Sequence, residues 1–492
     1  MGASLVNVYK KLRTGSESPN LKQRASEAIH DDFLRAAVRF TTDRLSSRKL
    51  QVTESLGNWQ EWRTRGKSIR EHTIQNLDYY LDQFSSNMEK AGGHVHFAAD
   101  AAEALEITDR IVKAKNAKLV AKSKSMVSEE LHINHVLEEN GVECIETDLG
   151  ERIVQLAHET PSHMIIPAIH KNRAQIKDLF EKESGETLTL ETRVLAAYAR
   201  RSLRKNFEDA DIGMTGCNFA IAESGSLVIF SNEGNGRMVT TLPKTHIAIM
   251  GMERILPSWQ DLEVMANLLP RSATGQKLTV YMTALTGPRR PLEMDGPEEV
   301  HVIVLDNGRS NILGDSEFVE VLNCIRCAAC LNVCPVYRQV GGHTYGAVYS
   351  GPIGAVITPL LNPTSKSASE LPFASSLCGA CYEACPVKIP LHDMLVHLRR
   401  RHVEAGRAPI AEQTAYHGFG IVAGSPALYR AAGAAGRWVQ LNVMPSSNII
   451  TTKEQITSNN PVLGWTAYRD LPTPSASSFH ALWKRKEAAN GT

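Results

Sequence analysis

Over the middle of the chain, apolar residues fall into short runs separated by polar stretches, and this pattern predicts β-strands that alternate with helices. Residues 128–131 have the composition of a capped helix start between two of these runs. Runs that are apolar almost throughout are typical of strands covered on both faces. The candidate strands are 119–121, 142–147, 164–166, 217–222, 226–230, 246–250, 278–281 and 300–304. The pattern therefore predicts an α/β domain with a mostly buried sheet.

Changes in this pattern divide the chain into four predicted regions. Residues 1–67 are polar and charged, with helical spacing at 30–38, and form an N-terminal helical extension. The α/β domain covers 68–315, and a cysteine-rich region of helices and turns covers 316–400. Residues 401–492 form a small C-terminal region that follows a basic helix at 395–401. A Pro/Ser segment at 471–478, followed by Phe479 and Trp483, predicts a tail that docks by its aromatic side chains.

Composition narrows the class of protein. The 492 residues are 42% hydrophobic, which supports substantial cores, and the net charge of +1 gives no indication of a nucleic-acid partner. No stretch of about eighteen apolar residues predicts a transmembrane helix. The basic N-terminus, with Lys10, Lys11 and Arg13, lacks the apolar run of a signal peptide. Together with the free cysteines, these features predict a multi-domain cytoplasmic protein.

Seven of the nine cysteines lie in two tight runs. The first run reads C-x2-C-x2-C-x3-C-P, the ligand spacing of a bacterial ferredoxin. The second run has the same register, but Ser375 stands where its first cysteine would be. The seven residues are Cys324, Cys327, Cys330 and Cys334 in the first run and Cys378, Cys381 and Cys385 in the second.

This spacing favours iron-sulfur clusters over zinc or a disulfide framework, because a zinc site has no use for the third cysteine or the Cys-Pro ending. In ferredoxins the cysteine before proline ligates the other cluster. We therefore expect crossed ligand sets: Cys324, Cys327, Cys330 and Cys385 for cluster 1, and Cys334, Cys378 and Cys381 for cluster 2. The fourth corner of cluster 2 faces Ser375 or solvent, and a loop hydroxyl or a helix cap is the simpler interpretation of Ser375 than a ligand. A site with three thiolates holds a 3Fe-4S cluster, or a 4Fe-4S cluster with a non-cysteine fourth ligand.

Other candidate residues carry weaker signals. Glu223, in Glu-Ser-Gly between two predicted strands, is a candidate nucleophile or a carboxylate bonded to the backbone of a tight turn. The glycine-rich segment 232–237 could cradle an anion, but it lacks the known nucleotide patterns. The remaining residues are expected to be structural: His132, His135, His246, His301, Cys144 and Cys217. No dinucleotide or flavin pattern is recognisable, so nothing here obviously accepts a hydride.

These features together resemble a known family. The first cysteine run with Val336 and Tyr337, the second run continuing to Ile389, and Ala-Glu-Ser-Gly-Ser at 222–226 are similar to the lactate utilization protein B family. The resemblance covers nearly the whole chain, and the family also has three cysteines in its second run. It implies two 4Fe-4S clusters and an α/β domain of the CoA-transferase type, followed by an α-helical ferredoxin-type domain and a small C-terminal region.

The resemblance also implies a function. The chain would be the iron-sulfur electron-transfer subunit of a complex that oxidises L-lactate to pyruvate, with lactate utilization proteins A and C as partners. Its electron acceptor is unidentified, and it would be cytoplasmic or membrane-associated through its partners. Two alternatives stay open: a CoA or acyl transferase using Glu223 with structural or regulatory clusters, and a redox-sensing scaffold.

Overall fold

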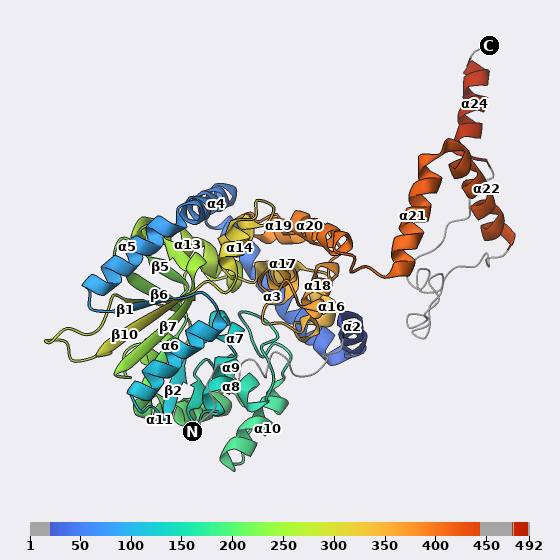
Figure 1. Cartoon of the computed structure of the whole chain (residues 1–492). Helices are drawn as coiled ribbons and strands as arrows, with labels where there is room; N and C mark the ends of the chain where they lie inside the picture. Colours follow the sequence, from blue (N-terminus) through green and yellow to red (C-terminus); the bar gives the residue numbers. More distant parts are fainter. Residues whose placement is uncertain (1–19, 443–474, 476, 491–492) are drawn as a thin grey trace. The chain divides into compact units, whose positions relative to one another are not determined.

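The computed structural model describes residues 20–442, 475 and 477–490. The chain divides into two compact units, Met1–His402 and Val403–Thr492. The first unit contains a six-stranded parallel sheet (Figure 1). Its strands in spatial order are β1 (His94–Ala98), β10 (Glu299–Leu305), β7 (Thr245–Gly251), β4 (Ile212–Thr215), β2 (Leu119–Lys122) and β3 (Glu143–Glu146). The predicted α/β domain with a mostly buried sheet is confirmed.

Alternate side chains of the central strands enter two different cores. Ile247 and Ile249 of β7 pack into a core shared with helices α6 (Ala101–Ala114), α7 (Met126–Glu130) and α8 (Ile133–Glu138). Ala248 and Met250 pack into the opposite core, with helix α5 (Leu77–Lys90) and a second sheet. Because both faces are covered, the central strands are mostly apolar, as the sequence pattern indicated. Further helices follow at α9 (Leu149–Leu156), α10 (Arg173–Ser184) and α11 (Thr192–Asp209).

The second sheet joins the α/β domain to the cysteine region. It has the strand order β8 (Ile255–Leu256), β5 (Phe219–Ile221), β6 (Ser226–Ser231), β9 (Tyr281–Leu285). Phe219 and Val228 of this sheet lie in one continuous core with α13 (Trp259–Ala273) and the cysteine runs. The α/β domain also contains the short helices α12 (Asn235–Val239) and α14 (Arg309–Leu313). The helices of the cysteine region are η2 (Val319–Asn323), α15 (Ala329–Val333), α16 (Tyr337–Val340), α17 (Gly351–Leu361), α18 (Lys366–Glu370), α19 (Ala380–Ala384) and α20 (Leu391–Glu404).

The N-terminal helices are α2 (Leu21–Ile29), α3 (Asp32–Glu54) and α4 (Trp59–Gln75). Helix α3 contacts α15 and α16, and α4 contacts α13 and η2. The expected boundary between residues 67 and 68 falls inside α4, and these helices pack on the cysteine region within the first unit. They form part of the wall around the cysteines.

Several predicted elements differ from the structure. The strand predicted at 164–166 is wrong: the backbone N–H groups of Ile165 and Ile166 donate to Nδ1 of buried His163 and bend the chain instead. The segment 278–281 overlaps β9 only at Tyr281. Helix α7 begins before residue 128, because Ser125 caps it. Strands β1 and β4 were not predicted.

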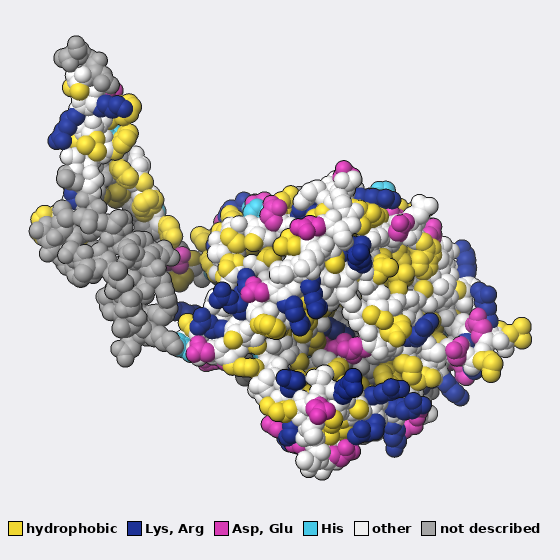
Figure 2. All heavy atoms as spheres, turned by 180° about the vertical axis from the view of Figure 1, so that it is seen from behind, with side chains coloured by type: hydrophobic (Ala, Val, Ile, Leu, Met, Phe, Trp, Pro, Cys, Tyr) yellow, Lys and Arg dark blue, Asp and Glu magenta, His cyan; other side chains and the backbone are white. Residues whose placement is uncertain are grey.

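The second unit is helical where it is described, with α21 (Ile410–Gly424), α22 (Pro426–Asn442) and α24 (Phe479–Asn490). Hydrophobic side chains are exposed along these helices, among them Phe419, Tyr429 and Trp483 (Figure 2). Most of the predicted Pro/Ser segment at 471–478 lies outside the described residues. Among the described helices, none is long and apolar enough to cross a membrane.

Candidate metal centre

The two cysteine runs have the same backbone path. Arg326 and Leu377, each just before a second cysteine position, have φ of 58° and 56°. The residues just after, Ala328 and Gly379, have φ of 59° and 78°. These left-handed residues turn each loop so that a short helix follows, α15 in the first run and α19 in the second. The repeated conformation agrees with the position-by-position match that places Ser375 opposite Cys324.

Each run ends by directing its last cysteine out of the short helix. Cys334 and Cys385 are both extended, with φ of −73° and −70°. Helices α15 and α19 pack against each other, which brings the end of each run beside the start of the other. A small cavity consequently has Cys324, Cys327, Cys330 and Cys385 in its lining. We call these four residues the first thiol set.

The other three cysteines also lie near one another, and we call Cys334, Cys378 and Cys381 the second thiol set. Burial, followed by the neighbouring Cys334 and Cys378, raises the pKa of Cys381 to about 12. In the first set, burial and then Cys385 raise the pKa of Cys327 to about 12. Thiols crowded in this way ionise only when a cation compensates them, so soft, cationic iron fits this donor set.

Backbone N–H groups point at the sulfur atoms. The backbone N–H of Arg326 donates to Cys324 Sγ at 3.4 Å, and the backbone N–H of Ile389 donates to Cys385 Sγ at 3.4 Å. At the equivalent position of the second run, the N–H of Leu377 donates to Ser375 Oγ at 3.1 Å. Ser375 Oγ therefore takes the place that Cys324 Sγ has in the first run.

The two sets differ in exposure and in nearby charge. In the second set Cys378 is exposed, and the other two cysteines are buried. In the first set Cys324 is half-buried, and the other three cysteines are buried. Arg63 donates to the carbonyl oxygens of Cys385 at 2.8 Å and Tyr382 at 2.7 Å. Further cations on this region are Lys49, which donates to the carbonyl of Ala384, and Arg254, which donates to that of Cys324. On the second run, Arg399 donates to the carbonyl of Ser375 at 2.8 Å.

A buried ion network holds the first cysteine loop against the α/β domain. Glu253, which is fully buried, accepts from Arg309 Nε at 2.7 Å and from Arg326 Nη2 at 3.3 Å. Burial would raise the pKa of Glu253, but Arg309, Arg254 and Arg326 outweigh it and lower the pKa to about 2. Arg309 also forms a paired contact with Glu130. Arg326 is thus fixed from the α/β side.

Glu223 lies in the turn between β5 and β6, exposed to solvent. Its Oε1 accepts the N–H of Trp259 at 2.6 Å at the start of α13. Gly225 in this turn has φ of +67°, and a Cβ there would lie 2.3 Å from the backbone nitrogen of Met88. These contacts account for the Glu-Ser-Gly sequence as a turn that packs on α5 and caps α13.

The remaining candidate residues lie away from the thiol sets. Cys144 is buried in the core of the sheet, and His246 Nε2 lies 2.9 Å from Thr215 Oγ1. His301 stacks on His94 and His96 with ring centroids 4.9 and 5.4 Å away. His132 and His135 belong to the α7–α8 segment. Cys217 is half-buried, and burial raises the pKa of its thiol to about 12.

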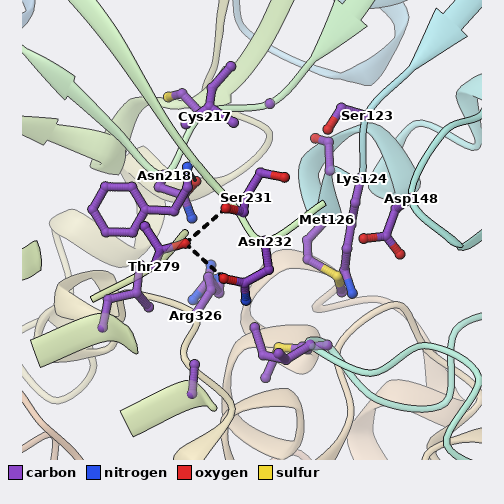
Figure 3. Close-up of a pocket in the computed structure, with 18 of the residues that line it drawn as sticks. Ser123, Lys124, Met126, Asp148, Cys217, Asn218, Ser231, Asn232, Thr279 and Arg326 are labelled. Atoms are coloured by element: carbon purple, nitrogen blue, oxygen red, sulfur yellow. Dashed lines mark hydrogen bonds between the residues drawn. The ribbon is translucent and has the colours of Figure 1, made fainter. Parts of the chain in front are cut away.

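A larger cavity lies next to the first thiol set (Figure 3). Cys217 and parts of the glycine-rich segment 232–237 line it, as do Lys124, Asn218 and Arg326. Lys124, Asn218 and Arg326 were missed as candidates. The only sequence signal for these residues is their position in the chain. Lys124 and Asn218 follow buried strands, and Arg326 lies between two cysteines of the first run.

The fold and the converging thiols define an iron-sulfur protein in which an α/β domain precedes a dicluster domain. Family models agree: a LUD domain matches residues 81–305, a 4Fe-4S dicluster domain matches 320–389, and the C-terminal domain of lactate utilisation protein B matches 400–488. Lactate utilization protein B of Bacillus licheniformis is 51% identical over 473 residues, covering 96% of this chain and 97% of that protein. Its counterpart in Bacillus subtilis (strain 168) is 51% identical over 474 residues, with the same coverage. The chain belongs to the lactate utilization protein B family.

Among solved structures, a DUF162 family protein from Deinococcus radiodurans is 17% identical and covers 46% of this chain and 98% of its own. Its TM-score of 0.26 is too low to support a comparison of folds.

Proposed function

We propose that this chain is the electron-carrying iron-sulfur subunit of a complex that oxidises L-lactate to pyruvate. The observation that carries the proposal is that six of the seven thiols, from two runs, lie in or against one core, with the exposed Cys378 beside Cys334 and Cys381. The relatives are named for lactate utilization, which supplies the substrate. Oxidation of lactate releases two electrons and two protons, and two clusters can each carry one electron. Lactate utilization proteins A and C are the proposed partners, in the cytoplasm.

In this proposal the first thiol set holds a 4Fe-4S cluster with four cysteine ligands. The second set holds a cluster whose fourth position faces Ser375, because Ser375 Oγ has the same N–H contact as Cys324 Sγ. The exposed Cys378 makes this second site the one that a partner can approach. The cations bound to the carbonyls of Cys385 and Cys324 favour an extra electron on the first cluster.

Substitutions at the ends of the runs test the crossed assignment. Cys385→Ser should remove the cluster of the first thiol set, although residue 385 belongs to the second run. Cys334→Ser should remove the cluster of the second thiol set. Low-temperature electron paramagnetic resonance and iron analysis of anaerobically purified protein measure both, with Cys217→Ser as the control outside the sets. If Cys385→Ser and Cys378→Ser lose the same signal, the crossed assignment is wrong.

A second experiment tests the function itself. The chain, reconstituted with its A and C partners, should show cluster reduction when L-lactate is added. Glu223→Gln should leave this reduction unchanged, because Glu223 caps α13 and is exposed. Loss of lactate-dependent reduction in Glu223→Gln, together with a CoA-exchange activity in the parent protein, would instead support the transferase alternative.

A further inference from the structure

The cavity next to the first thiol set lies where the order of the parallel strands reverses. From β2 the chain continues to β3 on one side of the sheet, and from β4 it continues to β7 on the other. The segments that follow β2 and β4, with Lys124 and Asn218, line a cavity of about 290 Å³. In open α/β sheets, ligands bind at the carboxyl ends of the strands at such a reversal.

Two buried cationic groups face this cavity with donors unused. Arg326 is 7% exposed, and its Nε and Nη1 have no hydrogen-bond partner. Lys124 Nζ is also buried without a hydrogen bond, and its nearest carboxylate, Glu151, lies 3.5 Å away. Burial raises the pKa of Glu151 to about 8, so this carboxyl compensates Lys124 poorly at neutral pH. Buried donors that find no acceptor are costly, and although Arg326 keeps its contact with Glu253, an anion in the cavity would satisfy the unused donors of both side chains.

The rest of the lining is partly apolar and partly polar, and its acidic residues are Asp148 and Glu233. Thr279 Oγ1 donates to the carbonyl of Ser231 at 3.1 Å and to Asn232 Oδ1 at 3.3 Å, as the dashed lines of Figure 3 show. Asp148 lies on the opposite side of the cavity from Arg326 (Figure 3). A ligand that suits this lining carries an anionic group at the arginine side and hydroxyl or carbonyl oxygens elsewhere.

The cavity shares a wall with the first thiol set. Met164 and Ile325 line both this cavity and the one bounded by Cys324, Cys327, Cys330 and Cys385. Arg326 lies between Cys324 and Cys327 in sequence, so a ligand held by its guanidinium would sit beside the first cysteine run.

We propose that this cavity binds a small organic acid whose carboxylate pairs with Arg326 and Lys124. The acid is of the 2-hydroxy or 2-oxo class, because its second oxygen matches the amide and hydroxyl groups of the lining. This proposal rests on the proposed function, and it adds that the α/β domain of this chain itself holds the acid.

Isothermal titration calorimetry on the full chain, purified anaerobically with its iron, tests the site. L-lactate and pyruvate are titrated separately, with inorganic phosphate as the third probe. We expect saturable binding of an organic acid that Lys124→Met weakens at least about tenfold. The matched control Lys113→Met removes an exposed lysine paired with Asp109 and should bind as the parent does.

Arg326→Gln is the second variant, scored only if its iron content equals that of the parent, and it should weaken binding by a similar factor. The proposal is overturned if neither acid binds, if phosphate binds in preference to both, or if Lys124→Met binds as tightly as Lys113→Met.

Because calorimetry needs neither partners nor electron transfer, binding without lactate-dependent cluster reduction would refute the proposed function alone. Reduction without binding to this chain would refute only the site.

Discussion

Replacing Glu253 by glutamine removes the only carboxylate that Arg326 contacts among the described residues, while keeping the side chain's shape. The pKa of Glu253 is lowered from 4.5 to about 2 because Arg309, Arg254 and Arg326 outweigh the effect of burial. A shift of about 2.5 pKa units at about 1.36 kcal/mol each corresponds to roughly 3 kcal/mol of stability. Since Glu253→Gln also leaves buried guanidinium groups uncompensated, we expect a loss of about 3–5 kcal/mol at pH 7.

The sign of the pH dependence follows from the lowered pKa. A depressed carboxyl contributes its full stability above the unfolded-state pKa of 4.5, and that contribution is lost as the pH falls towards 2. The difference between the parent and Glu253→Gln should therefore narrow by about 2 kcal/mol between pH 7 and pH 3.

Circular-dichroism melts of the metal-free proteins at one scan rate measure this difference. At pH 7 the Tm of Glu253→Gln should be several degrees below that of the parent. Glu320→Gln is the control, because Glu320 pairs with Lys67 at 2.9 Å while both side chains are about a third exposed. Such a pair contributes at most about 1 kcal/mol. The reasoning fails if Glu253→Gln melts like Glu320→Gln, or if its deficit is the same at pH 3 as at pH 7.

Lys49→Met removes a cation that binds the carbonyl of Ala384, and it should lower the reduction potential of the cluster on the first thiol set by roughly 50 mV, about 1 kcal/mol for one electron. Lys113→Met should leave this potential unchanged. A potentiometric titration followed by electron paramagnetic resonance measures both variants. Ser375→Cys should supply a fourth thiolate to the second thiol set and slow its loss of iron in air; a loss rate equal to the parent's would show that Ser375 is not at the fourth position. Gly225→Ala should destabilise the protein by about 1–3 kcal/mol, because the added Cβ meets the backbone of α5. The control Gly185→Ala, at a residue with φ of +72° and open space around it, should cost about 1 kcal/mol. Equal shifts in melting temperature would contradict the close approach of Gly225 to α5.

Strand prediction succeeded where local pattern and burial agree. Strand β7 is buried at every position and contains the apolar run 247–250. Strand β4 was missed because Gly213 interrupts it. That glycine is required by packing, since a Cβ would lie 2.1 Å from the carbonyl oxygen of Val239. Strand β1 was missed because it alternates two histidines with apolar residues, and it is an edge strand whose His96 lies against His301.

The sequence by itself determined the kind of donor set, because ligand spacing within a loop is a local property of the chain. It also determined that the second run lacks one cysteine, and the shared backbone path of the two runs agrees with that comparison. The ferredoxin pattern predicted the crossed sets, but only the tertiary structure brings their thiols together, because that depends on how α15 packs against α19. It alone placed Lys124, Asn218 and Arg326 around one cavity, because these residues come from segments far apart in the chain and meet only when the sheet and the cysteine region share a core.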